Sequence, residues 1–167
     1  MKWVTRQYVH VDRTACPWLI KRFVDPKAEF LFVPNEKIEE TVKKENAIPY
    51  DAANIELTHH GDKCSFDAII EKYKIKDPAV LELAKIVRAA DTDKMEMAPE
   101  AAGLEAIMTG FGMTSKVDYE TIAKASPVYD AFYTNCKLKL VRERYKADIE
   151  KLDRKDRREF LKKKLTE

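Results

Sequence analysis

Glycine is scarce in this chain, which has only four glycines among its 167 residues. Phosphate-binding loops and dinucleotide-binding turns need several glycines close together, because the backbone must approach the phosphate groups there. The sequence also has no G-x-S-x-G nucleophile elbow and no H-E-x-x-H zinc motif. The chain therefore carries none of the usual signatures of nucleotide-binding folds, serine hydrolases or zinc peptidases.

Long apolar runs are missing as well. No stretch of 18 apolar residues occurs, and charged residues interrupt the chain from Lys2 onward. We therefore expect neither a signal peptide nor a membrane span. The cysteines are odd in number and scattered, which disfavours a disulfide framework and favours a reducing, cytoplasmic location. They are Cys16, Cys64 and Cys136.

Charge is distributed unevenly along the chain. The net charge is +2, but residues 137–167 contain 13 lysines and arginines against 7 acidic residues, so the rest of the chain is acidic. We predict a single globular domain over residues 1–146 and a charged helical extension over residues 147–167. The extension has a thin apolar stripe, which indicates either a homodimer formed through this helix or a frayed end.

A basic segment of this kind can also attract nucleic acid or an acidic partner. Its charges are mixed in sign, however, as on an ordinary solvated helix face. No helix-turn-helix signature stands out in the chain, so the domain by itself is not expected to bind nucleic acid.

The predicted fold is α+β, or α/β, with a small N-terminal sheet of about four strands packed against a mainly helical C-terminal half. Alternating or continuous apolar runs predict strands over 3–11, 28–33, 47–50 and 55–58. Thr14 is the expected N-cap of the first helix, with Pro17 in its first turn. Later helices are expected over 36–45, from Ser65, over 78–90, 99–109 and 118–124, and from Pro127.

The junction between the first strand and the first helix is a candidate anion site. Arg6 and Arg13 bracket it, and His10 shares the predicted strand face of Arg6. Arginine has a planar fork of donors that suits carboxylates and tetrahedral oxyanions, and a helix N-terminus adds free amides and partial positive charge. Salt bridges with neighbouring carboxylates would explain the same arginines.

Cys16 lies near the predicted N-terminus of the same helix. Helix amides and Arg13 are expected to lower the pKa of its thiol, which would suit a redox or nucleophilic role. Cys64 is a second redox candidate. A free cysteine is also a common small core residue.

A metal site is the other function that the polar residues of this chain suggest. The segment HHGDKC places His59 and His60 close to Cys64, and imidazole and thiolate suit zinc, iron or copper. Adjacent histidines in extended chain point to opposite sides, so we expect only one of them to reach the site. His60, Cys64, Asp12 and Asp91 are the candidate ligands, and zinc is a candidate divalent metal. As the alternative to a metal role, His59 and His60 are candidates to bind the oxyanion or to form ordinary hydrogen bonds.

Several of these segments together resemble the C-terminal domain of ChrB-type chromate resistance proteins. They are WVTRQYVHVDRTACPWLIKRF, DPKAEFLFVP, AIPYD, ELTHHGDKCSFDAII, ADTD, PEAAGLEAI and PVYDAFY, and they cover roughly residues 1–136. The resemblance implies a role in bacterial chromate resistance, in a family whose members are regarded as chromate-sensing regulators. It implies that the first candidates for the chromate site are Arg6, Arg13, His59 and His60, followed by Cys16 and Cys64.

The sequence therefore predicts a protein that senses or binds chromate, or a related oxyanion, at a strand–helix junction. Two alternatives stay open. One is a metal-dependent, hydrolase-like enzyme with His, Cys and Asp ligands, and the other is a non-catalytic module that binds a partner.

Overall fold

The sheet at the N-terminal end of the molecule has three parallel strands. The computed structural model describes all 167 residues, with β1 (Lys2–Arg6) between β2 (Glu29–Val33) and β3 (Ile48–Pro49). Trp3 pairs with both Phe30 and Ile48. A small N-terminal sheet and a helical remainder confirm the predicted α+β fold, although the sheet has one strand fewer than expected.

The missing strand is the one predicted over residues 55–58. These residues form a series of bends instead. Asp51 and Asn54 both adopt left-handed backbone conformations, with φ of 47° and 59°, and reverse the chain direction directly after β3. The amide of Asp51 donates to the carbonyl of Leu57, which closes this segment into a loop.

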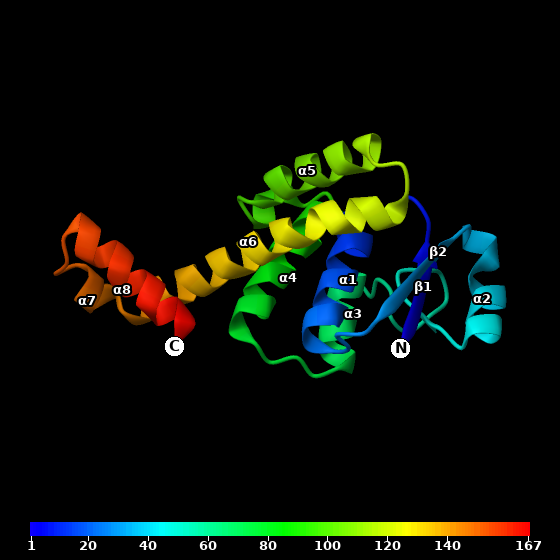
Figure 1. Ribbon diagram of the computed structural model, residues 1–167, viewed down its shortest axis with the longest axis horizontal. Helices are drawn as coiled ribbons and strands as arrows, with labels where there is room; N and C mark the ends of the chain where they lie inside the picture. The colour runs from blue at the N-terminus through cyan, green and yellow to red at the C-terminus, as the bar shows by residue number, and fades with distance from the viewer.

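Helices cover both faces of the sheet, as a parallel sheet requires. Trp3 lies in the main core with α1 (Val11–Phe23) and α3 (Ser65–Lys72). The next residue, Val4, points to the opposite face and packs in a small second core with Ile38. That face is covered by the 3-10 turn η1 (Asn35–Lys37) and α2 (Ile38–Glu45) (Figure 1).

The helical half consists mainly of α4 (Pro78–Asp91), α5 (Ala101–Thr114) and α6 (Asp118–Arg144), with a short 3-10 turn, η2 (Met95–Met97), before α5. Asp77 caps α4 as its sequence predicts, because its carboxylate accepts from the amides of Ala79 and Val80. The predicted break at Pro127 is wrong: α6 continues through it. Tyr129, Tyr133 and Cys136 pack into the core beyond the proline, and this packing outweighs its helix-breaking tendency.

The predicted end of the preceding helix near residue 109 is also wrong. Gly110 and Gly112 follow that position, but α5 runs through both glycines and ends at Thr114. Each glycine has helical backbone on both sides, and neither has the positive φ that a glycine helix stop uses.

The first strand is shorter than predicted. It ends at Arg6, and Tyr8 turns the chain with a φ of 62°. The carboxylate of Asp118 accepts hydrogen bonds from the amides of Tyr8 and Val9 and so fixes this turn. As a result α1 begins at Val11 with His10 as its N-cap, and the predicted cap at Thr14 is wrong.

The C-terminal extension is a pair of short helices, α7 (Lys146–Ile149) and α8 (Arg154–Thr166), which fold back along the end of α6. The ring of Phe160 packs edge-on against Tyr145, with centroids 5.7 Å apart, and Ile149 and Leu161 are buried. This end of the molecule extends away from the sheet (Figure 1). No helix anywhere in the chain is long and apolar enough to cross a membrane.

Candidate functional site

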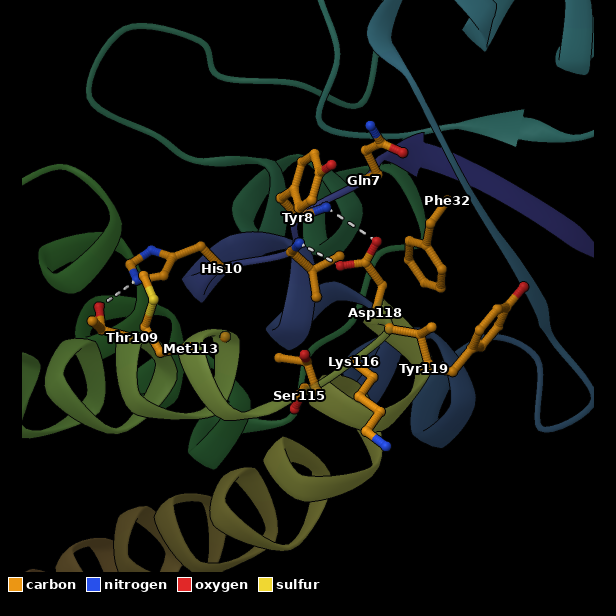
Figure 2. A pocket seen from close by; sticks show the side chains of 14 residues that line it. Gln7, Tyr8, His10, Phe32, Thr109, Met113, Ser115, Lys116, Asp118 and Tyr119 are labelled. Atoms are coloured by element: carbon orange, nitrogen blue, oxygen red, sulfur yellow. Dashed lines mark hydrogen bonds between the residues drawn. The ribbon is translucent and has the colours of Figure 1, made fainter.

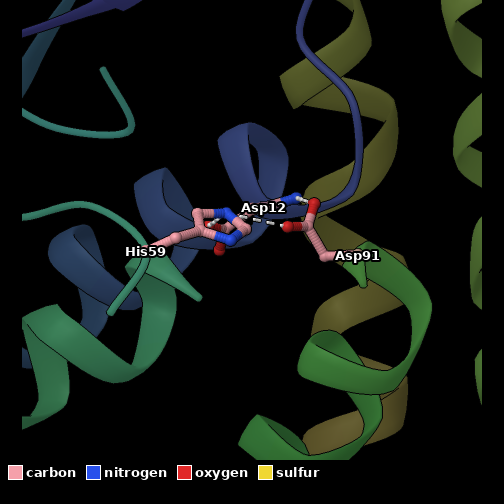
Figure 3. A group of neighbouring side chains, drawn as sticks. All are labelled: Asp12, His59 and Asp91. Atoms are coloured by element: carbon pink, nitrogen blue, oxygen red, sulfur yellow. Dashed lines mark hydrogen bonds and ion pairs between the residues drawn. The ribbon is translucent and has the colours of Figure 1, made fainter. Parts of the chain in front are cut away.

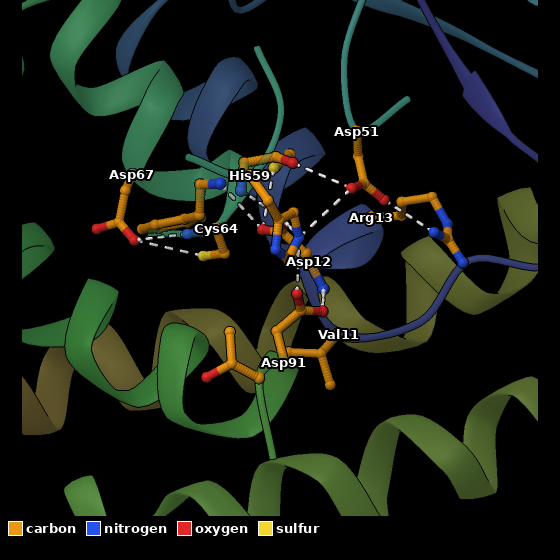
Figure 4. A network of polar contacts seen from close by, with 12 residues as sticks. Val11, Asp12, Arg13, Asp51, His59, Cys64, Asp67 and Asp91 are labelled. Carbon is orange, nitrogen blue, oxygen red and sulfur yellow. Dashed lines mark hydrogen bonds and ion pairs between the residues drawn. The ribbon is translucent and has the colours of Figure 1, made fainter. Parts of the chain in front are cut away.

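A polar network lies where the carboxyl ends of β1 and β3 meet. From β1 the chain passes to β2 on one side of the sheet and later reaches β3 on the other side. Open α/β sheets place their ligand sites at such a switch point, because the connections there leave the sheet in opposite directions. Arg6 ends β1. Asp12 lies in the first turn of α1, and Asp51 follows β3 (Figure 4).

Asp12 is held by the N-terminus of α3. Its side chain is 2% exposed, and its two oxygens accept from the amides of Ser65, at 2.7 Å, and Phe66, at 3.0 Å. These amides have no partner within their own helix, and the helix dipole adds positive potential at this end. The negative charge of Asp12 is therefore stabilised although the side chain is buried.

Asp51 is paired with two arginines. Its Oδ2 accepts from Arg13 Nη1 at 2.8 Å and from Arg6 Nη2 at 3.1 Å, while its Oδ1 accepts from the Ser65 hydroxyl at 3.0 Å. Burial alone would raise the pKa of Asp51, but the charges of Arg13 and Arg6 outweigh burial and hold the pKa below its ordinary value. Asp51 is therefore ionised, and its single negative charge compensates one of the two arginine charges.

The imidazole of His59 lies close to three carboxylates. Its Nε2 lies 3.1 Å from Asp91 Oδ2, 3.5 Å from Asp12 Oδ2 and 3.6 Å from Asp51 Oδ1 (Figure 3). Asp91 is the last residue of α4, and its other oxygen accepts from the amide of Asp12 at 3.1 Å. Ligand atoms of Asp12, His59 and Asp91 all lie within 4.8 Å of one another.

The close grouping and the burial of these side chains raise two pKa values. The hydrogen bond to Asp12, together with the surrounding carboxylates, raises the pKa of His59 to about 9. Burial, and then the charge of Asp12, raise the pKa of Asp91 to about 7. The cluster thus binds protons more tightly than isolated side chains do, as a site that attracts positive charge should.

The structure brings together five of the residues that the sequence singled out: Arg6, Asp12, Arg13, His59 and Asp91. His60 lies outside the network. Its Nε2 is 2.7 Å from the carbonyl oxygen of Glu56 on an exposed loop. Only one of the adjacent histidines therefore faces the cluster, as expected, and it is His59.

His10 also lies outside the network, in a neighbouring hollow of about 650 Å³ (Figure 2). Its Nε2 is 3.0 Å from the hydroxyl of Thr109. The hollow is lined by apolar and polar side chains, among them Tyr8, which is 80% exposed, and Met113. Because β1 stops at Arg6, His10 and Arg6 do not share the strand face that the sequence predicted.

The cysteines are buried thiols. Burial, with Asp12 nearby, raises the pKa of Cys16, and burial also raises that of Cys64. The Sγ of Cys16 donates to Asp12 and the Sγ of Cys64 donates to Asp67, each at 3.5 Å. The expected lowering of the Cys16 pKa is therefore wrong. The helix starts four residues earlier than predicted, so Cys16 lies in its second turn, away from the free amides.

Cys64 helps to position the helix end that binds Asp12. It is the N-cap of α3, and its amide donates to Asp67, whose carboxylate is held by Arg88 through two hydrogen bonds of 2.6 and 2.8 Å. This pair fixes the helix end that binds Asp12. The sequence does not predict Asp51, Ser65 or Asp67 as site residues. The one signal that points to Asp51 is its position just after a short predicted strand.

Comparison with known proteins decides the family. The family model described as "ChrB, C-terminal domain" matches residues 3–136. The chain belongs to the ChrB C-terminal domain family. The Protein ChrB of Cupriavidus metallidurans is 32% identical over 137 residues, which are 80% of this chain. The matched part is 40% of that ChrB protein, so the chain corresponds to about two fifths of its length. No solved structure matches the chain.

The family match includes every residue of the polar network and most of α6. It ends at residue 136, before α7 and α8, so the C-terminal helix pair lies outside the ChrB domain as the family is defined.

Proposed function

We propose that this ChrB-family domain takes part in chromate resistance by holding a divalent cation on Asp12, His59 and Asp91, and by binding chromate or a related oxyanion at that cation. One observation carries the proposal. Three ligand atoms from separate elements, α1, the loop after β3 and the end of α4, lie within 4.8 Å of one another.

The spacing of these atoms suits a small cation. Zinc binds imidazole nitrogen and carboxylate oxygen at about 2.1 Å, and tetrahedral geometry then separates neighbouring ligand atoms by about 3.4 Å. The Nε2 of His59 is 3.1 Å from Asp91 and 3.5 Å from Asp12. Both distances match the separation expected for two ligands of one ion.

The support of each ligand also fits a metal centre. Metal-binding side chains are commonly oriented by further hydrogen bonds. Asp12 accepts from two amides of α3, and Asp91 accepts from the amide of Asp12. Each carboxylate is thus oriented by a backbone donor.

A cation also explains how an oxyanion can bind here. Chromate is a dianion at neutral pH, and three carboxylates surround His59. Bare carboxylates would repel it, whereas a divalent cation supplies the missing positive charge and an open coordination position. Arg6, whose side chain is 41% exposed, borders the site and can contribute further donors.

Direct binding of the oxyanion without a metal is the second candidate. One observation favours it: Nε of Arg13 is buried and has no hydrogen-bond partner. A buried donor without an acceptor is costly, and an oxyanion oxygen would satisfy it. In this case Arg13 and Arg6 would have to give up some of their hydrogen bonds to Asp51 and form hydrogen bonds to the oxyanion instead.

Calorimetry separates the two candidates. Chromate and sulfate are titrated into the native protein with and without one equivalent of zinc, and into the R13A variant. The cation proposal predicts oxyanion binding to the zinc-loaded protein and none in the presence of EDTA. Binding that persists in EDTA and is lost in R13A would support the second candidate instead.

A further inference from the structure

The C-terminal helix α8 carries a cluster of unpaired positive charge. It contains seven lysines and arginines and two acidic residues. Four of the cations line one surface hollow together with Glu159: Arg154, Lys155, Arg158 and Lys162. All four are exposed, and none forms an ion pair. Residues 154, 158 and 162 follow one another at four-residue spacing and therefore share a face of the helix.

The packing of α7 and α8 leaves this face of α8 exposed. Phe160 packs against Tyr145, Leu161 is buried, and Asp153 caps α8 by accepting from the amides of Lys155 and Asp156. The apolar stripe of α8 is thus used against α6 within the same chain. The charged side chains are exposed to solvent. The helix lies at the end of the molecule that extends from the sheet (Figure 1).

We infer that α8 binds the phosphate backbone of nucleic acid, without reading its sequence. With a rise of about 1.5 Å per residue, the cations from Arg154 to Lys162 span about 12 Å. Duplex DNA presents roughly seven phosphate charges over that length. Four flexible cations on one face match such a regular, dense array of charge.

Other polyanions fit this face less well. A helix that lies on a lipid surface needs apolar side chains free to enter the membrane, and those of α8 are packed on α6. The ChrB domain itself is not the source of this charge, since residues 1–136 are acidic overall. The binding surface therefore belongs to the helix pair that follows residue 136, and the inference is independent of the cation site.

The test is fluorescence anisotropy with a labelled 20-base-pair duplex of arbitrary sequence, using the full chain at 50 and 200 mM salt. A quadruple variant, R154Q/K155Q/R158Q/K162Q, is compared with a control of equal charge change in the domain, K27Q/K43Q/K44Q/K76Q. These control lysines are exposed and form no ion pairs. Circular dichroism of each variant checks that the helices are retained.

The native protein is expected to bind with a dissociation constant on the order of 1–10 µM at 50 mM salt. The α8 variant should weaken binding at least tenfold and make the dependence of log K on log salt shallower by about 3–4, whereas the control should change little. The inference is overturned if the native protein does not bind the duplex at 50 mM salt, or if the two variants lose affinity equally. Binding to phosphatidylserine vesicles without binding to DNA would also overturn it.

Discussion

The Nε2 of His59 lies 3.1 Å from Oδ2 of Asp91, and that same nitrogen is within 3.6 Å of two further carboxylates, those of Asp12 and Asp51. A protonated imidazole compensates one negative charge. The remaining charge is met by the two arginines beside Asp51 and by the amides of α3 beside Asp12, which leaves Asp91 the least stabilised of the three carboxylates.

Asp91 should therefore destabilise the metal-free protein. The pKa of its carboxyl is about 7 in the folded chain, well above the ordinary value of 3.8 that applies when the chain is unfolded. A raised carboxyl pKa costs stability as pH rises between these values, and the full cost is present above pH 7. We expect D91N to stabilise the metal-free protein at pH 8 by no more than about 4 kcal/mol and to have little effect near pH 4. Guanidinium denaturation in EDTA at both pH values measures this.

The matched control for Asp91 is D93N, in the exposed turn directly after α4. It should show no comparable difference between the two pH values. A destabilising effect of D91N at pH 8 in EDTA would mean that the carboxylate serves the fold, and would remove the electrostatic argument for a cation.

Asp12 should be a structural residue as well as a ligand. Its oxygens satisfy the amides of Ser65 and Phe66, which are buried in the interior. D12A leaves these donors without acceptors, so we expect a loss of about 2–4 kcal/mol in the free energy of unfolding even without metal. Urea denaturation of native protein and D12A in EDTA checks this, and a loss below about 1 kcal/mol would contradict it.

Arg13 and Arg6 should differ in their contribution to stability although both bind Asp51. The Arg13 side chain is 18% exposed and that of Arg6 is 41% exposed. Solvent screens the exposed pair more strongly, so we expect R13A to cost about 2–3 kcal/mol and R6A less than about 1 kcal/mol. Thermal denaturation of both variants at pH 7 tests the order. Equal losses would show that burial does not distinguish the two pairs.

The thiols should be unreactive in the folded protein. Cys16, Cys64 and Cys136 are buried, and burial raises the pKa of each. A thiol reagent such as dithionitrobenzoate at pH 8 is expected to modify none of them within minutes, and all three after denaturation in guanidinium. Rapid modification of Cys16 or Cys64 in the native protein would restore the redox interpretation of that residue.

Sequence reasoning succeeded where a signal is local. The Asp77–Pro78 pair predicted the start of α4, and the apolar segment closed by Pro34 predicted β2. It failed where long-range contacts decide. The turn at Tyr8 depends on Asp118, and the continuity of α6 through Pro127 depends on core packing beyond it. The error at Tyr8 also changed the predicted environment of His10 and Cys16.

The site was predictable in its components but not in its geometry. Arg13, Asp12, Asp91 and the histidine pair were each visible as reactive residue types. Their grouping was not predictable. His59 and Asp91 lie on elements that come into contact only in the folded chain, and no spacing in the sequence predicts that contact. The choice of His59 over His60 likewise depends on the loop after β3, where Glu56 binds His60.

Binding of one divalent cation by Asp12, His59 and Asp91 can be seen directly in a crystal structure of the zinc-soaked protein, with anomalous data collected at the zinc edge. We expect one strong anomalous peak within about 2.3 Å of His59 Nε2 and of one oxygen each from Asp12 and Asp91. The peak should persist in H60A and be absent from H59A. A peak on His60 or Cys64 instead, or no peak at the cluster in the native protein, would contradict the claim.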